Sequence, residues 1–525
     1  MAGWTSPQEH LTCNSTRDCE LRRSSCPDMN EKNDFALVPS PSSAVEKAGP
    51  GARRILSGMV ADTLALRREP VALAGKIFRI GDYEWCEPDY RQILLWAEAL
   101  GLKPEVVIDR LLVIPPRVGY PGLPSWAITR FEYGRIISVF WHLGLLKLSE
   151  FEWVDGLEIR SVCLFDRWDA NPGESRTNIK KICLPGHKLG NFGAFCLEID
   201  ELNLSRVPNL TSLLLSSSKL TKLNLSQVPN LTNLVCYATP LSQLDLSRVP
   251  KLTLIECTYA RIADLDLANV PNLTKLECSG NLLDHLELSN VPRLISLNCN
   301  GNERITELDL SCVPNLSTLS CSSNQLTTLN LSRVPNLRHL FCNRNQLTTV
   351  DLSHVPSLEL LSCTENRLER LALSDVPDLK SLGCDSNQLT TLDLSRVPNL
   401  RSLSCDSNQL TTLDLSHVGN IDTLMCSKNR LAKLNYSNLT NLNWLWCGSN
   451  SLTRLDLSRM PHLKELYCME NQIAELDLSR VPNLTSLSCN GNQIVALDIR
   501  HLHSLRCLSY DTSRTKLIKR PDQDF

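Results

Sequence analysis

Cysteine recurs at a fixed interval along most of this chain of 525 residues, each time within the same short text. The interval is 21 residues, except for one step of 22 where the text NGNERIT carries an additional residue. A constant period of this length predicts an array in which every repeat is one coil stacked on the next. The recurring residues are Cys236, Cys257, Cys278, Cys299, Cys321, Cys342, Cys363, Cys384, Cys405, Cys426, Cys447, Cys468 and Cys489.

Each repeat contains the text LxxLxCxxN, whose nine places we number 1 to 9. Leu400, Leu403 and Cys405 fill places 1, 4 and 6 of one repeat, and apolar residues spaced in this way predict a short strand with alternate side chains inward. Asn408 at place 9 predicts an amide ladder that bonds backbone groups of stacked coils. The other half of the repeat, LDLSRVPN, usually contains proline, which excludes a regular helix there.

The repeat text resembles the leucine-rich repeats of bacteria, especially internalin-like proteins with a cysteine ladder. The resemblance covers about 300 residues. It implies a leucine-rich-repeat solenoid with a parallel β-sheet on the concave face, a non-helical convex side and a small, mainly helical N-terminal cap. The chain departs from secreted internalins, since we find no signal peptide or wall anchor. It also departs from ubiquitin-ligase effectors with such repeats, because a large catalytic domain would follow the array there.

The cysteines at place 6 occupy a position that other leucine-rich repeats give to an aliphatic residue. Leu215 holds this place in the coil before the run, which supports the equivalence. Free cysteine behaves as a small hydrophobe, and neighbouring rungs about 4.8 Å apart would stack. Metal binding needs clustered spacings such as CxxC, which the chain lacks. We therefore predict inert buried thiols, no metal and no cofactor, and a reducing compartment.

Composition changes along the chain divide it into regions. Two helices are predicted before the array, one beginning near Pro88 and ending at Gly101, the other beginning at Pro104. The text from 131 to 199 looks like eroded repeats, as expected for the cover of an open end. The predicted regions are a disordered leader (1–50), a helical N-terminal region (51–130), degenerate repeats or cap (131–199), an array of about 15 coils (200–512) and a polar tail (513–525).

The net charge of −3 and the absence of a basic stripe argue against a nucleic-acid partner. The longest apolar run, near Ile136 to Leu148, is too short to span a bilayer, so no membrane partner is expected. No apolar signal segment is visible at the start. We expect a cytoplasmic protein, or one exported without a cleaved signal as an injected effector, with residues 1–50 as the export segment.

Places 2, 3, 5, 7 and 8 vary between coils and should project from the concave face. Six of the eight aromatic residues in the repeats fall at these places, and the other two, Tyr436 and Tyr510, replace core residues. The densest group lies in three successive coils and should form one surface, because its members are in register. We call this group the aromatic patch; its residues are Met425, Trp444, Trp446, Tyr467 and Met469, with Lys428, Lys464, Glu465 and Glu470 as its expected rim.

Two smaller groups are further candidates for partner contact. One consists of Tyr237, Glu256, Tyr259 and Glu277, and the other, a basic spot on one coil, of Arg338, His339, Phe341 and Arg344. The aromatic patch also has other interpretations: self-association of two arrays, or cover by the C-terminal segment.

No catalytic constellation is recognised in the sequence. The text GHKLGNFG lacks the spacing of a phosphate loop, and His501, His503 and Cys507 fall in a degenerate last repeat. We therefore expect no enzyme but a scaffold that binds a protein or peptide ligand on the concave face. The alternative is an enzyme or effector with an unrecognised activity in residues 51–199 and the repeats as its recognition arm; a surface adhesin is a third reading.

Overall fold

The structure is a computed structural model that describes residues 77–80, 83–100, 102–112, 130–132, 135–142, 150–151, 157, 159–165, 181–195, 199–436 and 439–523. All of them lie in one compact unit, Val71–Phe525. The predicted leader (1–50) lies outside the described residues, as do parts of the regions predicted at 51–130 and 131–199.

The first described elements are a β-hairpin and two helices. Strands β1 (Ile77–Ile80) and β2 (Tyr83–Cys86) pair antiparallel, a hairpin that the sequence interpretation did not anticipate. Helices α2 (Glu87–Leu100) and α3 (Pro104–Leu112) begin and end close to the predicted positions. Helix α2 lies against the hairpin and α3 against strand β4, so a small helical region stands at the N-terminal end of the sheet.

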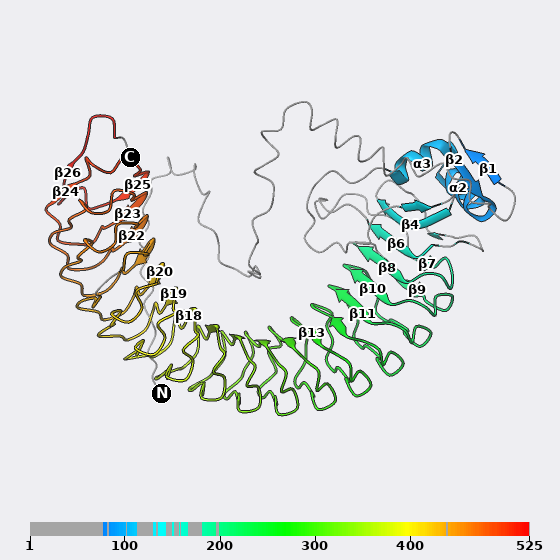
Figure 1. Cartoon of the computed structure of the whole chain (residues 1–525), viewed down its shortest axis with the longest axis horizontal. Helices are drawn as coiled ribbons and strands as arrows, with labels where there is room; N and C mark the ends of the chain where they lie inside the picture. The colour runs from blue at the N-terminus through cyan, green and yellow to red at the C-terminus, as the bar shows by residue number, and fades with distance from the viewer. Residues whose placement is uncertain are drawn as a thin grey trace, which may run out of the picture. The chain divides into compact units, whose positions relative to one another are not determined.

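One long sheet runs through the unit. Strand β3 pairs antiparallel with β4, and every later pairing in this sheet is parallel, each strand with that of the next coil (Figure 1). In order of pairing, the strands are β3 (Arg130–Glu132), β4 (Arg135–His142), β6 (Ser161–Phe165), β8 (Asn191–Phe195), β10 (Ser212–Ser216), β11 (Asn233–Tyr237), β12 (Leu254–Glu256), β13 (Lys275–Glu277), β14 (Ser296–Asn298), β15 (Thr318–Ser320), β16 (His339–Phe341), β17 (Leu360–Ser362), β18 (Ser381–Gly383), β19 (Ser402–Ser404), β20 (Thr423–Met425), β21 (Trp444–Trp446), β22 (Glu465–Tyr467), β23 (Ser486–Ser488) and β25 (Cys507–Ser509).

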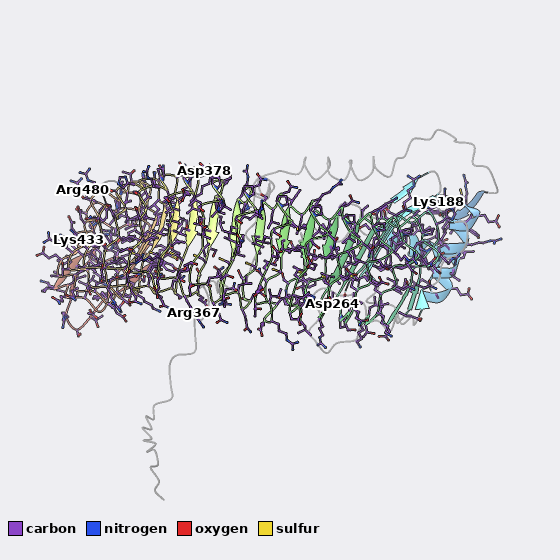
Figure 2. The ribbon with its side chains drawn as sticks, turned by 90° about the horizontal axis from the view of Figure 1, so that it is seen from below. Lys188, Asp264, Arg367, Asp378, Lys433 and Arg480 are labelled. Carbon is purple, nitrogen blue, oxygen red and sulfur yellow. The ribbon has the colours of Figure 1, made fainter. Side chains whose placement is uncertain are left out.

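The sheet lines the inner, concave side of the coils, and loops form the outer side (Figure 1). Short additional strands lie in the outer half of the terminal coils: β5 (Glu150–Phe151), β7 (Lys181–Cys183) and β9 (Glu201–Asn203) at one end, β24 (Ala496–Asp498) and β26 (Lys516–Ile518) at the other. Charged side chains of the loops stand along the two lateral edges, Asp264 and Arg367 on one and Asp378 and Arg480 on the other (Figure 2). The predicted leucine-rich-repeat solenoid, with its non-helical convex side, is confirmed.

Every coil buries the same set of side chains. In the coil of β19, Leu400, Leu403 and Cys405 at places 1, 4 and 6 are fully buried, and Val397 from the outer half closes the core. On strand β19 the buried Leu403 is flanked by Ser402 and Ser404, which are half exposed. The period-2 pattern of the sequence therefore translates directly into an inward and an outward face.

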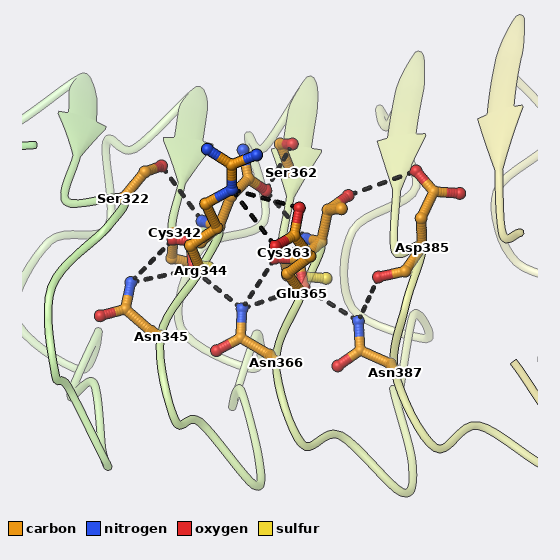
Figure 3. A network of polar contacts seen from close by, with 12 residues as sticks. Ser322, Cys342, Arg344, Asn345, Ser362, Cys363, Glu365, Asn366, Asp385 and Asn387 are labelled. Atoms are coloured by element: carbon orange, nitrogen blue, oxygen red, sulfur yellow. Dashed lines mark hydrogen bonds and ion pairs between the residues drawn. The ribbon is translucent and has the colours of Figure 1, made fainter. Parts of the chain in front are cut away.

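The place 9 asparagine joins the backbone of two successive coils, as predicted. Asn408 Nδ2 donates to the carbonyls of Cys405 (3.2 Å) and of Cys384 in the preceding coil (2.9 Å). Its Oδ1 accepts the N–H of Leu389 at 3.0 Å. Figure 3 shows the same arrangement for Asn345, Asn366 and Asn387, whose amides satisfy backbone groups that would otherwise be buried without partners.

The aspartates of the LDLS text close turns on the outer side. Asp393 Oδ1 accepts the N–H of Ser395 at 2.9 Å, and these hydrogen bonds from Ser395 hold the pKa of the Asp393 carboxyl below its usual range. These exposed carboxylates therefore form a row of local side-chain-to-backbone turns along the outer side.

The single 22-residue step leaves the sheet intact. Ser296 on β14 pairs with Thr318 on β15, and Cys299 N–H donates to Ser320 O at 2.8 Å as in other coils. The additional residue is taken up in the turn after the strand, where Ile305 N–H donates to Asn302 O at 2.9 Å.

The last described residues pack on the final coil. Strand β26 pairs in parallel with β24, and Thr515 Oγ1 donates to Ile494 O at 2.7 Å. Gln523 Nε2 donates to the carbonyls of Ile499 (3.0 Å) and Leu502 (3.1 Å). The region predicted as a polar tail therefore forms a small cap on the outer half of the array as far as Gln523.

Candidate functional site

The aromatic patch forms one surface on three adjacent strands. Met425 on β20 is paired in register with Trp446 on β21, and Trp446 with Tyr467 on β22, all at place 5. The rings of Trp446 and Tyr467 meet edge to face with centroids 5.3 Å apart. All three side chains are half buried and alternate with the inward leucines of their strands, so they project from the outer face of the sheet, which is the concave face. The sequence prediction that these residues come together is confirmed; their role in binding is taken up below.

Two neighbours extend the patch to either side of the place 5 row. Lys464 Nζ lies 5.7 Å from the centroid of the Trp444 ring, a cation–π distance. Met469 at place 7 lies over Gly448, and a Cβ added at residue 448 would stand 2.5 Å from the Met469 Sδ. The patch is therefore packed against its own floor, and Gly448 is what allows Met469 to lie there.

The polar atoms of the patch are unequally satisfied. Tyr467 Oη shares a hydrogen bond with Ser486 Oγ at 3.2 Å. The Trp446 Nε1 atom is buried and has no hydrogen-bond partner among the described residues. An unsatisfied buried donor costs about 1–3 kcal/mol, so this ring is not placed for stability alone. On the rim, Lys428, Lys464 and Glu470 are exposed, and Glu465 is half buried.

A second row of side chains, at place 7, runs beside the place 5 row and was missed by sequence reasoning. In this row an oxygen of one coil accepts the place 7 N–H of the next: Asn343 Oδ1 from Thr364 (2.8 Å) and Asp385 Oδ1 from Asp406 (2.7 Å). Asp406 in turn accepts the N–H of Ser427. Part of this row is visible in Figure 3. The sequence signal was present, since every place 7 residue from 300 to 427 is Asn, Ser, Thr or Asp.

The two aspartates of this row, which we call the acidic pair, lie on neighbouring coils. Burial, and then the charge of Asp385, raise the pKa of the Asp406 carboxyl to about 6, against the opposing hydrogen bonds from Ser427 and the charge of Lys428. A carboxylate with a raised pKa on a half-buried face carries a free-energy cost near neutral pH.

The comparisons with known proteins agree with this geometry. The functional domain of InlJ from Listeria monocytogenes, which includes a cysteine ladder, is 30% identical over 62% of this chain and 67% of that domain, with a TM-score of 0.52. This chain belongs to the internalin-type leucine-rich-repeat proteins. A scan against protein-family models and a search of curated proteins returned no match.

Two more distant structures share the internalin-type fold. The leucine-rich-repeat protein LIC12759 of Leptospira interrogans is 22% identical over 63% of this chain and 90% of its own, with a TM-score of 0.53. YopM from Yersinia enterocolitica WA-314 is 21% identical over 82% of this chain and 99% of its own, with a TM-score of 0.55. At these identities the likeness concerns the repeat fold alone.

The ladder cysteines of this internalin-type array are core residues. All 13 are buried and free, and burial raises the pKa of the Cys257 and Cys299 thiols to about 12. A thiol held in its protonated form is a poor nucleophile and a poor metal ligand. Within the described residues, no group of three or more His, Cys, Asp or Glu is placed to hold a metal ion.

The second candidate group is present as an exposed aromatic pair. Tyr237 and Tyr259 are 40% and 52% exposed and meet edge to face with centroids 6.0 Å apart. Tyr259 lies over Gly280, where an added Cβ would meet its ring at 2.3 Å. Beside the pair, burial and then the charge of Glu277 raise the pKa of Glu256.

The third candidate group does not form a basic spot. Arg338 pairs with Glu359 (3.0 Å) and Arg344 with Glu365 (3.2 Å), both across to the next coil. The charge of each arginine is therefore offset by a carboxylate of the next coil, as Figure 3 shows for Arg344 and Glu365, and the Phe341 side chain is half buried.

Other sequence-derived assignments concern packing rather than contact with a partner. Tyr436 and Tyr510 lie against the core, as their replacement of core residues predicts.

A surface hollow of about 390 Å³ opens beside strands β19 to β21 and is lined by Arg401, Asn420, Asp422, Asn441 and Asn443. Among the described residues, no helix has the length and apolar content to cross a membrane.

Proposed function

We propose that the array is a scaffold that binds a protein or peptide partner on its concave face, with the aromatic patch at the centre of the contact. The observation that carries this proposal is the register of Met425, Trp446 and Tyr467, half exposed on three adjacent strands. Tryptophan, tyrosine and methionine are enriched at the centres of interfaces, because they bury much area with little loss of side-chain entropy.

The contrast with the preceding coils supports the proposal. The same place 5 row holds Ser362, Gly383 and Ser404 on the three strands before Met425. The fold thus accepts small residues at this place, and packing of the array does not call for large rings. An exposed cluster that the fold does not need is best explained by a partner.

The structure also bears on what covers the patch. The C-terminal residues as far as Gln523 pair with β24 and bond the loop carbonyls of Ile499 and Leu502, on the outer half of the coil. This position favours an external partner over internal cover. Self-association remains the competing occupant, and the test below separates the two.

The test compares two double variants of the full chain in a binding assay. Trp444→Ala/Trp446→Ala removes the indoles, and Leu282→Ala/Ile295→Ala, which removes two exposed apolar side chains outside every candidate group, is the control. Truncating central aromatic anchors costs about 2–4 kcal/mol, so we expect a loss of at least about 30-fold in partner affinity for the first variant only. Circular dichroism confirms that both remain folded. Equal affinity of the tryptophan variant and wild type would overturn the proposal, and capture of a second copy alone would identify self-association.

We infer further that the protein is bacterial and works in a reducing compartment, either the cytoplasm of the cell that makes it or that of a host cell it enters. The relative from Listeria monocytogenes and the stack of free buried thiols support this inference. Fractionation of producing and host cells with an antibody to the array tests it, and recovery from the oxidising cell exterior alone would contradict it.

A further inference from the structure

The aromatic patch and the acidic pair belong to one continuous surface. The place 5 row continues from Gly383 and Ser404 into the patch. Beside it, the place 7 row continues from Asp385 and Asp406 through Ser427 to Gly448. Ser404 Oγ donates to Asp385 Oδ1 (2.6 Å) and lies 3.6 Å from Met425 Sδ. Ser404 therefore contacts both the acidic pair and the aromatic patch. A partner seated on the patch, as proposed above, therefore meets two carboxylates beside it.

The fold does not need the charge of these carboxylates. Asn343 occupies the same place two coils earlier, and its Oδ1 accepts from Ser362 Oγ and Thr364 N–H, both at 2.8 Å. Asp385 Oδ1 accepts the equivalent two bonds, from Ser404 Oγ and Asp406 N–H. An amide oxygen thus does the structural work, and a carboxylate in its place adds repulsion and desolvation without an additional backbone bond.

The acidic pair also differs from nearby acids in having no cation bound to it. Glu359 is paired with Lys380 and Arg338, and Glu365 with Arg344. Within the part of the chain that the structure describes, neither Asp385 nor Asp406 forms an ion pair; the charge of Lys428 acts on Asp406 without direct contact. A residue retained at a cost to stability is typical of a functional surface.

The floor in front of the acidic pair is open. Place 5 there holds Gly383 and Ser404, and a Cβ added at Gly383 would make only ordinary contacts, the nearest at 3.4 Å from Ser362 Oγ. Packing therefore does not require glycine at this position. The small residues leave the carboxylates accessible from the concave side.

We propose that the partner is a protein segment that sets a lysine or arginine side chain on the acidic pair and an aliphatic or aromatic side chain on the aromatic patch. Charge complementarity decides for a basic segment and against a phosphate-bearing ligand. Asp406 and Trp446 are two strands apart and Asp385 and Tyr467 four, or about 10 and 19 Å at the usual strand spacing. An extended segment covers these distances in about three to six residues.

The first experiment selects binders from a random peptide library displayed on phage, with the immobilised full chain as bait. We expect enriched peptides to carry a basic residue and an apolar one about three to six positions apart. Selection on Asp385→Asn/Asp406→Asn should keep the apolar residue and lose the basic one, and selection on Trp444→Ala/Trp446→Ala should enrich neither. Peptides without a basic preference on the wild-type chain would overturn this inference while leaving the proposed function standing. Failure to enrich any peptide on wild type would overturn both.

The second experiment measures the coupling between the carboxylates and the basic residue. A selected peptide is synthesised with its arginine or with citrulline, and each form is titrated against wild type and Asp385→Asn/Asp406→Asn. We expect the variant to lose about tenfold in affinity for the arginine peptide and almost nothing for the citrulline peptide. Equal losses for both peptides would overturn the inference. The control Asp393→Asn/Asp414→Asn removes the same charge from the outer side and should leave both affinities unchanged.

A steric block gives an independent check on the open floor. Gly383→Tyr places a ring at a position where Phe341 and Tyr467 occupy the equivalent places of other coils, so the array should stay folded. We expect it to lower the affinity of the arginine peptide by at least about tenfold, because the ring covers the approach to the acidic pair. Unchanged affinity in a folded Gly383→Tyr chain would contradict a contact at this floor.

Discussion

Met469 lies directly over Gly448, close enough that a Cβ at residue 448 would stand 2.5 Å from its sulfur. Gly448→Ala should therefore displace the flexible methionine and reshape the aromatic patch without removing any of its side chains. We expect the free energy of unfolding to change by less than about 1 kcal/mol and partner affinity to fall several-fold. Urea titration and a binding isotherm measure both. Gly190→Ala, where an added Cβ meets only ordinary contacts and which lies on a coil remote from the patch, is the control that should leave both unchanged.

The amide ladder should dominate the stability of individual coils. Asn408→Ala leaves the buried N–H of Leu389 without its partner and removes one of two amide donors from each of the carbonyls of Cys384 and Cys405, which keep Asn387 and Asn429. The unsatisfied donor costs about 1–3 kcal/mol and each lost bond to a carbonyl about 0.5–1 kcal/mol, so we expect a loss of about 3 kcal/mol in urea unfolding. Asn399→Ala removes one exposed bond, to Pro377 O at 3.2 Å, and should cost well under half as much. Equal effects of the two would contradict a buried ladder.

The acidic pair predicts a pH dependence of stability. The pKa of Asp406 is raised to about 6 in the folded chain and is about 3.9 in an unfolded one. The unfolded state therefore binds fewer protons between these values, and the stabilising contribution of the protonated acid is complete below about pH 4 and lost as the pH rises through 6. At pH 7.5 we expect the free energy of unfolding of Asp406→Asn, measured by urea titration, to exceed that of wild type by about 1 kcal/mol. This difference should disappear by pH 4. A gap that widens on acidification would reverse the sign and refute the assignment.

The ladder thiols should not react with alkylating reagents in the native chain. Cys312 and Cys507 are exposed, whereas the ladder cysteines are buried. Treatment with iodoacetamide, followed by peptide-resolved mass spectrometry, should label those two and leave the ladder unmodified until urea unfolds the coils. A ladder cysteine that reacts as fast as Cys507 under native conditions would show that its coil opens locally.

The parts of the structure that could be predicted are those in which one place of the repeat has one physical role. Leu403 and Cys405 had to be inward, Asn408 had to bond stacked backbone, and residues at the same place, such as Trp446 and Tyr467, had to meet. The structural data leave the binding role of the patch as a prediction, because register brings side chains together without saying what they touch.

Other features escaped prediction for reasons that are also physical. Asp385 and Asp406 stand at a variable place, where a short polar side chain is equally typical of a solvated surface, and only the hydrogen bonds between coils reveal a row. Strand β26 pairs with β24 through backbone groups, which leave little trace in side-chain pattern. The β1–β2 hairpin is short and precedes a strongly periodic helix, which drew the whole segment into a helical interpretation.

The single 22-residue step shows that an insertion in a turn leaves the sheet register untouched. Gain or loss of a complete coil would likewise keep every row aligned, but it would move two surface features apart or together by one strand, about 4.8 Å. The separation between the acidic pair and the aromatic patch can therefore change only in whole steps. The number of coils therefore sets the distance between these two surfaces, and duplication of a 21-residue unit would adapt the array to a longer ligand without changing the residues of either surface.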